Sequence, residues 1–403
     1  MSMLKKTICY LLAILMLTTA LAGCGGEPAA KSVAEDVSTA SEQKADEKAP
    51  VEKTEEEPVI KSIIPAELPR YRIGVMYYTF TDKLGSQMKN ALDYIADDFN
   101  VEFEYIEASW SAEAGQAAME TALQTGLDGI IAVSSGVAVV EACKKAGNVP
   151  FVSIQVEPID NDVAADMAAY DCYLGAVSEN DMQVGINAVE ALYESGVRNL
   201  AICGLTQGYA RSHDDRMRGV KSAIKQYDDL NLIAEDYTLA EYAKSVSSFA
   251  AAYPELDGLF VSQGVESIYQ TMNTEGLIGS VKLAMVDISE STGDYFDNGT
   301  LVYIAGGQYG TTMIGFALLY NYLCDGTRII PDTSVTLRRP FLEVKSSEEY
   351  QHYVKHVDGD IPVYTAEEIA QLIHGFNPDA NYGTFAKAAA DYSLEDIVAR
   401  HGE

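Results

Sequence analysis

The chain is poor in basic residues, histidine and tryptophan. Its 403 residues include 28 Lys and Arg against 60 Asp and Glu, with five His and one Trp. The formal net charge is -32. Because nucleic acids bind proteins through clustered Lys and Arg, we exclude them as partners. The histidines lie mostly near the C-terminus, and we interpret them as surface residues rather than catalysts.

Motifs of the common enzyme classes are also missing. The first strand-like segment is not followed by GxGxxG, and the chain lacks GxxxxGK[ST], HExxH, GxSxG and paired metal-ligand spacings. We therefore predict that the protein is not an enzyme and needs no cofactor and no metal.

The cysteines beyond the N-terminal region form no CxxC pair. They are Cys143, Cys172, Cys203 and Cys324, each in apolar surroundings, and we interpret them as small core residues. Export would permit a disulfide among them, but the sequence does not assign one.

The N-terminus has the order of a secretory signal. Lys5 and Lys6 precede the apolar run 7–22, which is short for a membrane span, and small residues follow. A buried helix is the alternative, but it would need a core to enter. The stretch LAGC, residues 21–24, resembles the bacterial lipobox. We therefore predict a signal peptide over 1–23 and lipidation of Cys24, which would anchor the chain to the membrane.

Residues 24–69 predict a flexible acidic linker. From residue 25 the segment is rich in Ala, Glu, Lys, Ser and Pro and lacks aromatic residues, so it cannot bury enough apolar area to fold. A charged helical stalk is the alternative. The remaining residues are numerous enough for two domains and hold no further stretch that could span a membrane.

From Tyr71 the chain alternates strand-like and helix-like segments. YRIGVMYY, VEFEYIEA, LDGIIAVSS and VPFVSIQV are β-rich, and amphipathic helical segments separate them. Apolar strands between helices predict a parallel sheet covered on both faces. The pattern restarts near Tyr173, where SEND at 178–181 predicts a capping box, and LDGLF at 256–260 repeats LDGII at 127–131.

These segments, in order over residues 72–344, resemble the type I periplasmic binding proteins, in particular the ribose/galactose-type sugar-binding components of ABC importers. The residues that carry the resemblance are 73–75, 127–131, 149–152, 175–185, 216–220, 256–260, 283–287 and 303–315. The resemblance implies an α/β fold of two Rossmann-like lobes with parallel sheets, joined by a hinge of three crossings.

The resemblance puts the crossings near Asp171, Gln308 and Arg338. The N-terminal lobe would comprise 71–171 and 309–338, and the C-terminal lobe 172–308 and 339–345. Residues 346–403 extend past the shared pattern as a helical C-terminal extension. Its apolar residues, Leu372, Ile373, Phe376 and Phe385, are expected to pack on the lobes.

Ligands of open α/β sheets bind outside the carboxyl ends of the strands, and two facing lobes share one cleft. The first strand ends in Tyr77, Tyr78, Thr79 and Phe80, of which Tyr78 and Phe80 are better candidates for the cleft, with core packing the alternative for Tyr77. Trp110 follows the second strand and is expected to form a stacking platform, with core packing as the alternative.

The resemblance implies further ligand-binding residues. Gln155 stands where sugar-binding relatives have an acidic residue, which is a departure from the pattern of ribose and galactose binders. Gln263 is at an Asn position, with Gly264 replacing the usual Asp. Asp287 matches the acidic residue that ends its strand, with a helix N-cap as the alternative, and Gln308 matches a glutamine near a crossing.

Two charged residues in RSHDDRMRGV, residues 211–220, need separate interpretations. Arg216 is expected to be a structural ion-pair member. Asp214 stands at the position of a ligand arginine, but it could equally cap its helix. Asp214 and Asp287 in one cleft would disfavour anions and suit a polyol or a cationic ligand.

The sequence thus predicts a monomeric, lipid-anchored receptor on the outer face of the cell membrane. It would capture a small polar molecule, a sugar or sugar-like polyol, for an ABC permease. Two alternatives stay open. One is a sensor of the same fold that signals to a membrane kinase or chemoreceptor, and the other is an extracellular enzyme or structural lipoprotein.

Overall fold

The computed structural model describes residues 62–108, 112–134, 136–239, 241–264, 266–289 and 291–402. The predicted signal peptide, Cys24, Trp110 and most of the predicted linker lie outside these residues. Within the described part, no helix combines the length and the apolar character needed to cross a bilayer.

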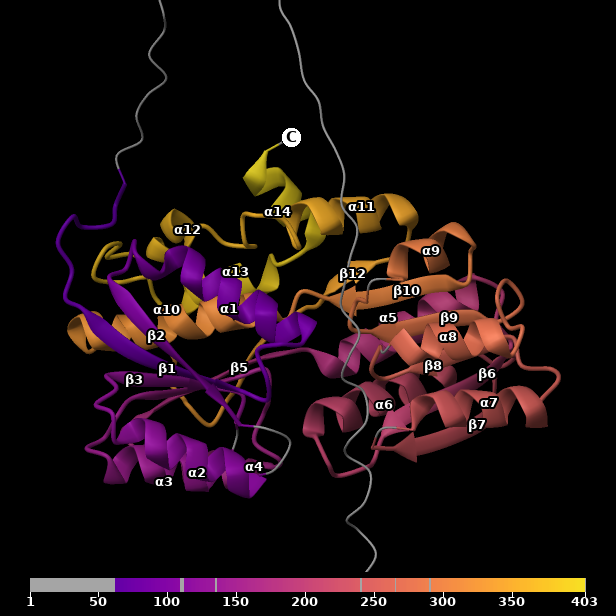
Figure 1. The fold of residues 1–403 in the computed structure, drawn as a ribbon, viewed down its shortest axis with the longest axis horizontal. Helices are drawn as coiled ribbons and strands as arrows, with labels where there is room; N and C mark the ends of the chain where they lie inside the picture. Colours follow the sequence, from indigo (N-terminus) through magenta and orange to yellow (C-terminus); the bar gives the residue numbers. More distant parts are fainter. Residues whose placement is uncertain are drawn as a thin grey trace, which may run out of the picture. The chain divides into compact units, whose positions relative to one another are not determined.

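Two six-stranded sheets organise the described chain (Figure 1). The first has the order β11-β5-β4-β3-β1-β2, and all its neighbouring strands are parallel. Its strands are β1 (Tyr71–Tyr77), β2 (Val101–Glu107), β3 (Gly129–Ala132), β4 (Phe151–Ile154), β5 (Tyr173–Glu179) and β11 (Leu337–Arg339).

The second sheet has the order β12-β10-β9-β8-β6-β7, in which only the edge strand β12 is antiparallel to its neighbour. Its strands are β6 (Asn199–Leu205), β7 (Asn231–Thr238), β8 (Gly258–Val261), β9 (Lys282–Val286), β10 (Leu301–Gly306) and β12 (Leu342–Val344).

Helices cover both faces of each sheet, as the continuous apolar strands predicted. The first sheet lies between α1 (Lys83–Ala96) and α10 (Tyr309–Asp325) on one face and α2 (Ala112–Leu123), α3 (Val137–Lys145) and α4 (Asn161–Ala168) on the other. The second lies between α5 (Asp181–Glu194) and α6 (Arg211–Ile224) on one face and α7 (Tyr242–Ala252), α8 (Glu266–Thr274) and α9 (Thr292–Asp297) on the other. The predicted fold class of two lobes with parallel sheets is confirmed.

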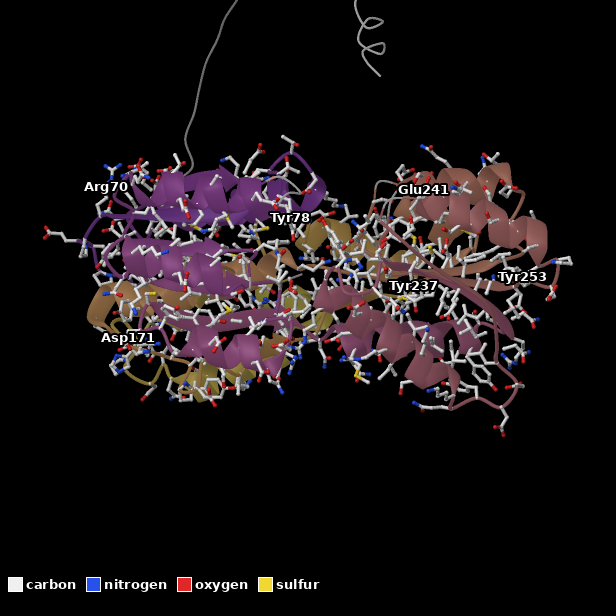
Figure 2. All side chains as sticks on the ribbon, turned by 90° about the horizontal axis from the view of Figure 1, so that it is seen from below. Arg70, Tyr78, Asp171, Tyr237, Glu241 and Tyr253 are labelled. Carbon is white, nitrogen blue, oxygen red and sulfur yellow. The ribbon has the colours of Figure 1, made fainter. Side chains whose placement is uncertain are left out.

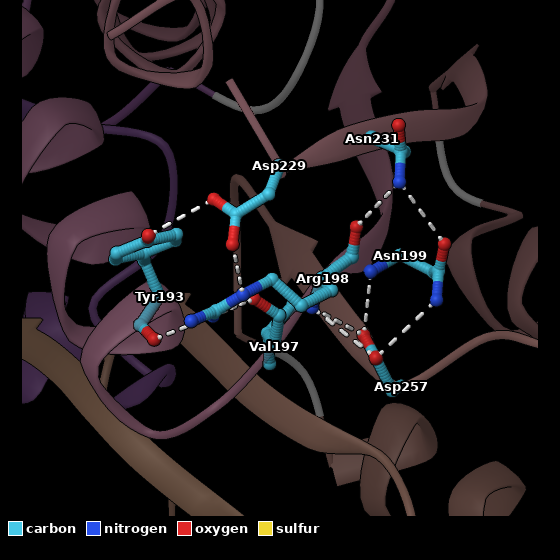
Figure 3. Close-up of polar contacts among 7 residues, drawn as sticks. All are labelled: Tyr193, Val197, Arg198, Asn199, Asp229, Asn231 and Asp257. Atoms are coloured by element: carbon cyan, nitrogen blue, oxygen red, sulfur yellow. Dashed lines mark hydrogen bonds and ion pairs between the residues drawn. The ribbon is translucent and has the colours of Figure 1, made fainter. Parts of the chain in front are cut away.

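The aspartate of the repeated LDG motif accepts the same kind of backbone hydrogen bond in both lobes. Asp257 accepts hydrogen bonds from the backbone N–H of Arg198, at 3.0 and 3.2 Å, and of Asn199, at 2.8 Å (Figure 3). In the first lobe the Oδ2 of Asp128 accepts from the backbone N–H of Arg72 at 2.7 Å. Each carboxylate therefore fixes the start of the first strand of its lobe, which supports the interpretation of the motif as a duplication.

The prediction that the chain first crosses near Asp171 is wrong. β5, which begins at Tyr173, pairs in parallel with β4 and so belongs to the first lobe. The crossing comes after Glu179, where Asn180 caps α5 by accepting from the backbone N–H of Gln183. The predicted capping box is wrong for the same reason, because Ser178 lies inside the strand. The chain returns to the first lobe between β10 and α10, and it crosses again between β11 and β12.

The C-terminal extension forms four helices, α11 (Ser347–His356), α12 (Ala366–Ala370), α13 (Tyr382–Ala390) and α14 (Leu394–His401). Leu372, Ile373 and Phe385 are buried in the main core, and Phe376 stacks on Phe99. The expectation that these residues pack on the lobes is confirmed. The extension explains why α10 is buried over most of its length, since α10 lies between the first sheet and α12.

Candidate functional site

A cavity of about 820 Å³ lies at the carboxyl ends of the strands of both lobes. Figure 2 shows the strand direction: Arg70, just before β1, lies at the outer end of the first lobe, and Tyr78, just after it, faces the second lobe. The lining residues come from three parts of the chain. They are Tyr77, Thr81, Asp82, Lys83, Leu84, Ser86 and Gln87 of the first lobe, Gln263, Gly264, Glu266, Asp287, Ile288, Ser289, Gly306 and Gln308 of the second lobe and the crossing, and Tyr353 of the extension.

Asp287 and Gln308 form the polar centre of this cavity. The Nε2 of Gln308 donates to Oδ1 of Asp287 at 2.6 Å, which leaves the second carboxylate oxygen able to accept from a ligand. Burial raises the pKa of Asp287, while the nearby Arg216 and the Gln308 hydrogen bond oppose that rise. Both predicted residues therefore line the same cavity and contact each other.

Gln155 and Asp287 occupy equivalent places in the two lobes. Each directly follows the third strand in its sheet order, β4 and β9 respectively, and each has a left-handed backbone, with φ of 61° and 73°. Such backbone in a non-glycine residue is unfavourable and is concentrated at functional sites. Gln155 does not line the cavity wall itself, but its Nε2 lies 3.4 Å from the backbone oxygen of Gln308 and so supports that residue.

Gly264 and Gln263 form a close turn beside Asp287. A Cβ on Gly264 would clash with the backbone oxygens of Val286 and Asp287. The aspartate that the family resemblance implied for this position would not fit this backbone approach. Gln263, which the resemblance implied as a ligand-binding residue, lines the cavity.

The aromatic cluster at the end of β1 is arranged differently from the prediction. Tyr77 lines the cavity although its side chain is buried, whereas Tyr78, Thr79 and Phe80 are not among the lining residues. The ring of Phe80 packs edge-on against Tyr105, and the Thr79 hydroxyl donates to Glu107 at 3.2 Å. The alternation of side chains along β1 turns Tyr77 inward. Tyr78 packs edge-on against Tyr77 and faces the second lobe, where Tyr209 lies nearby.

Asp214 is not brought into this cavity. Its carboxylate accepts from the backbone N–H of Gly208 at 3.0 and 3.2 Å, in the loop before α6, so it fixes its own loop. Arg216 is the predicted ion-pair member: its Nε donates to Oδ1 of Asp181 at 2.6 Å, and its Nη1 donates to the backbone oxygen of Ser262 at 2.7 Å. Both side chains of this pair are buried, at 8% and 6% exposed.

Sequence reasoning missed several lining residues. Lys83 and Gln87 lie on the first turns of α1, the helix after β1. This position could have identified them, because a helix that follows a parallel strand starts at the carboxyl edge of the sheet, where the cavity lies. Tyr353 comes from the extension, and no pattern in the sequence around it indicated a place in the ligand site. In the described residues, no three His, Cys, Asp or Glu side chains gather in a way that could hold a metal ion.

A second cavity, of about 540 Å³, lies between the extension and β12 and is away from the strand ends. Its lining carboxylates are Glu343, Glu349 and Glu395. Glu343 already accepts from Asn187 and from Tyr303 at 3.0 Å and forms an ion pair with Lys345 at 3.2 Å, and Glu349 accepts from the backbone N–H of Lys345 at 2.6 Å. The Glu343 oxygens are thus already bound by donors of the protein itself. We therefore assign the ligand site to the cleft at the strand ends.

Comparison with known proteins decides the family. Residues 73–327 match the family described as a periplasmic binding protein domain. The chain belongs to the periplasmic binding proteins. The predicted resemblance is confirmed, and the family is one of binding proteins rather than enzymes. A comparison with curated protein sequences finds no match.

Solved structures share the fold of this periplasmic binding protein. An ABC transporter solute-binding protein from Actinobacillus succinogenes with bound D-allose has a TM-score of 0.62 at 18% identity, over 70% of this chain and 100% of that one. One from Bacillus halodurans with bound myo-inositol has a TM-score of 0.57 at 18% identity, over 71% and 99%. A fructose-binding periplasmic domain of a hybrid two-component system has a TM-score of 0.59 at 15% identity, over 72% and 96%.

Proposed function

We propose that this periplasmic binding protein is a lipid-anchored receptor outside the cytoplasmic membrane that captures a sugar or polyol for an ABC importer. The observation that carries the proposal is the Asp287–Gln308 pair in the cleft cavity, which presents a carboxylate and an amide oriented for hydroxyl groups. D-allose and myo-inositol, bound by the two solute-binding proteins of the same fold, are ligands of this neutral, hydroxyl-rich kind.

The charges around the cavity support a ligand without negative charge. Asp82, Glu266 and Asp287 all line it, against one lysine, Lys83. A phosphorylated sugar or a carboxylate would meet like charges, which disfavour binding. A neutral polyol can accept from Lys83 and donate to the carboxylates.

When the ligand binds, the lobes would close on it, and the permease would recognise this closed form. Shifting the equilibrium between open and closed forms from 99:1 to 1:99 requires that the ligand bind the closed form about 5.5 kcal/mol more tightly than the open form. Several hydrogen bonds made only in the closed form, at about 1 kcal/mol each, supply that amount together with apolar contacts. The residues available come from both lobes, as closure requires.

A ligand screen tests the proposal. We expect D-allose, D-fructose, myo-inositol or another hydroxyl-rich compound to raise the melting temperature, because ligands of the native state stabilise it by mass action. Nucleosides and amines form the comparison set. Stabilisation by amines alone would replace the sugar by a cation, and no stabilisation by any compound would overturn the proposed function.

A sensor is the second candidate function, because one solved structure of the same fold belongs to a hybrid two-component system. Uptake of the identified ligand in cells that lack the protein separates the two functions. Loss of uptake supports the importer, whereas normal uptake with loss of ligand-induced transcription supports the sensor.

The anchor has its own test. We expect wild-type protein in bacterial cells to incorporate labelled fatty acid and to fractionate with membranes. Cys24→Ser should appear without label in the medium or the soluble extracytoplasmic fraction. We also propose a monomer, which light scattering of the soluble part checks.

A further inference from the structure

The C-terminal extension, residues 346–403, lies outside the part of the chain that matches the family. It contacts both lobes. α11 packs on α9 and β12 of the second lobe, whereas α12 packs on α10 and α13 on β11 of the first lobe. An element fixed to both lobes in this way is in a position to affect the cleft between them.

Tyr353 of α11 reaches the ligand cavity from this extension. Its side chain is 1% exposed, and it is one of the lining residues. Its hydroxyl lies at the end of β10, where a Cβ on Gly306 would come within 2.9 Å of the Tyr353 Oη and 3.0 Å of Ile288 Cδ1. Glycine at 306 therefore provides the space that the phenol occupies.

The Tyr353 phenol is protonated at neutral pH, as any tyrosine with its ordinary pKa is, and burial raises that pKa further. Its oxygen already accepts from the backbone N–H of Gly307. A protonated phenol can both donate and accept, which matches a ligand hydroxyl. It lies in the same wall as Asp287 and Gln308, the polar centre of the cavity.

Asp358, just after α11, holds two further lining residues. Its Oδ2 accepts from the Nζ of Lys83 at 2.8 Å, and its Oδ1 accepts from the Nε2 of Gln87 at 2.6 Å. Lys83 and Gln87 belong to α1 of the first lobe and line the cavity. Both oxygens of one carboxylate thus set the position of two polar side chains of the cavity wall.

The extension also fixes the backbone beside Gln308. The hydroxyl of Tyr309 donates to the backbone oxygen of Val357 at 2.8 Å and accepts from the backbone N–H of Val363 at 3.0 Å. The hydroxyl of Tyr392 donates to the backbone oxygen of Gly307 at 2.7 Å. The residues on both sides of Gln308 are therefore tied to the extension.

We propose that the C-terminal extension is a wall of the ligand site: Tyr353 contacts the ligand, and Asp358 is a positioning residue that orients Lys83 and Gln87. This inference rests on the proposed function of the cleft as a sugar or polyol site. It assigns to the extension a role in ligand selectivity.

The test uses the full chain with Tyr353→Phe and Asp358→Asn. Their matched controls are Tyr382→Phe, a surface tyrosine of α13, and Glu348→Gln, an exposed residue of α11. Calorimetric titration with D-allose, D-fructose and myo-inositol gives the affinities. Melting temperatures show that each variant is folded.

We expect Tyr353→Phe to weaken binding about 3- to 10-fold, the effect of removing one hydrogen bond, and to change the ratio of affinities among the three compounds. Asp358→Asn should weaken binding of all three. The controls should bind like the wild type. Unchanged affinities and ratios in Tyr353→Phe, with the wild type binding, would overturn the assignment of Tyr353 as a contact.

A second readout needs no ligand. Acetylation of Lys83 by acetic anhydride, followed by mass spectrometry, should be at least twofold faster in Asp358→Asn than in the wild type and Glu348→Gln. An unchanged rate would overturn the positioning role. If the wild type binds none of the three compounds and no other hydroxyl-rich one, the proposed function fails, and the acetylation rate alone then decides whether the extension sets this wall.

Discussion

The side-chain amide of Gln308 donates to the carboxylate of Asp287 at 2.6 Å, and this bond joins a lobe crossing to the end of β9. The bond uses Oδ1 and leaves Oδ2 of Asp287 for the ligand that we propose. It also ties the proposed ligand contact to the segment between β10 and α10, where the chain passes from one lobe to the other. In the proposed function, ligand recognition and lobe closure would therefore share one hydrogen bond.

Asp287→Asn should weaken ligand binding about 10- to 100-fold, because a hydrogen bond to a charged group contributes about 1.5–3 kcal/mol. The isosteric amide keeps the volume and can still contact Gln308, so the fold should hold. Calorimetric titration with the stabilising sugar measures the loss. Asp228→Asn, at an exposed position of the second lobe, is the control and should bind normally.

Much of the fold was predictable because it depends on local patterns. Apolar strands and amphipathic helices alternate along the chain, and the LDG motif marks the same hydrogen bond in each lobe. The family resemblance singled out Gln263, Asp287 and Gln308, and all three line the cavity at the strand ends.

The errors have physical reasons. The predicted start of the second lobe at residue 172 is wrong because β5 pairs with β4 of the first lobe, and the sequence carries no local signal for which strands pair. Tyr77 and Tyr78 are neighbours whose directions depend on where the strand ends. Tyr353 lies far along the chain from the strands it approaches, so only the folded structure shows that it lines the cavity.

Gly264→Ala should disrupt the site more than the fold. A methyl group there meets the backbone oxygens of Val286 and Asp287, and those atoms have to move. We expect ligand affinity to fall at least tenfold, with a destabilisation of about 1–3 kcal/mol from overpacking. Gly136→Ala is the control, since nothing lies near its added Cβ. Unchanged affinity in Gly264→Ala would contradict the close turn beside Asp287.

Arg216→Ala should lower the free energy of unfolding by about 3–5 kcal/mol, the effect of breaking a buried pair and leaving Asp181 without its partner. Urea unfolding measures the change. Arg70→Ala removes an exposed partner of Glu102 and should change the unfolding free energy by less than about 1 kcal/mol. If Arg216→Ala lowers the unfolding free energy by as little as Arg70→Ala does, the buried Arg216–Asp181 pair contributes little to stability.

His213 should make stability depend on pH. Its Nδ1 lies 3.2 Å from the Ser262 hydroxyl, and burial, together with the Arg216 charge, lowers its pKa well below the ordinary value of 6.5. Below pH 6.5 the unfolded chain therefore binds a proton that the native state excludes, so the free energy of unfolding falls as pH falls. The loss is about 1.4 kcal/mol per pH unit until the native imidazole is protonated.

His213→Asn removes this titration and retains a polar group beside Ser262. Between pH 7 and pH 5 we expect the melting temperature of the wild type to fall about 2–4 °C further than that of the variant. Ser212→Ala, the neighbouring position on α6, carries no titrating group and should follow the wild type. If His213→Asn and the wild type lose stability in parallel over this range, the native imidazole takes up its proton as readily as the unfolded chain does, and its burial beside Arg216 has no effect on acid stability.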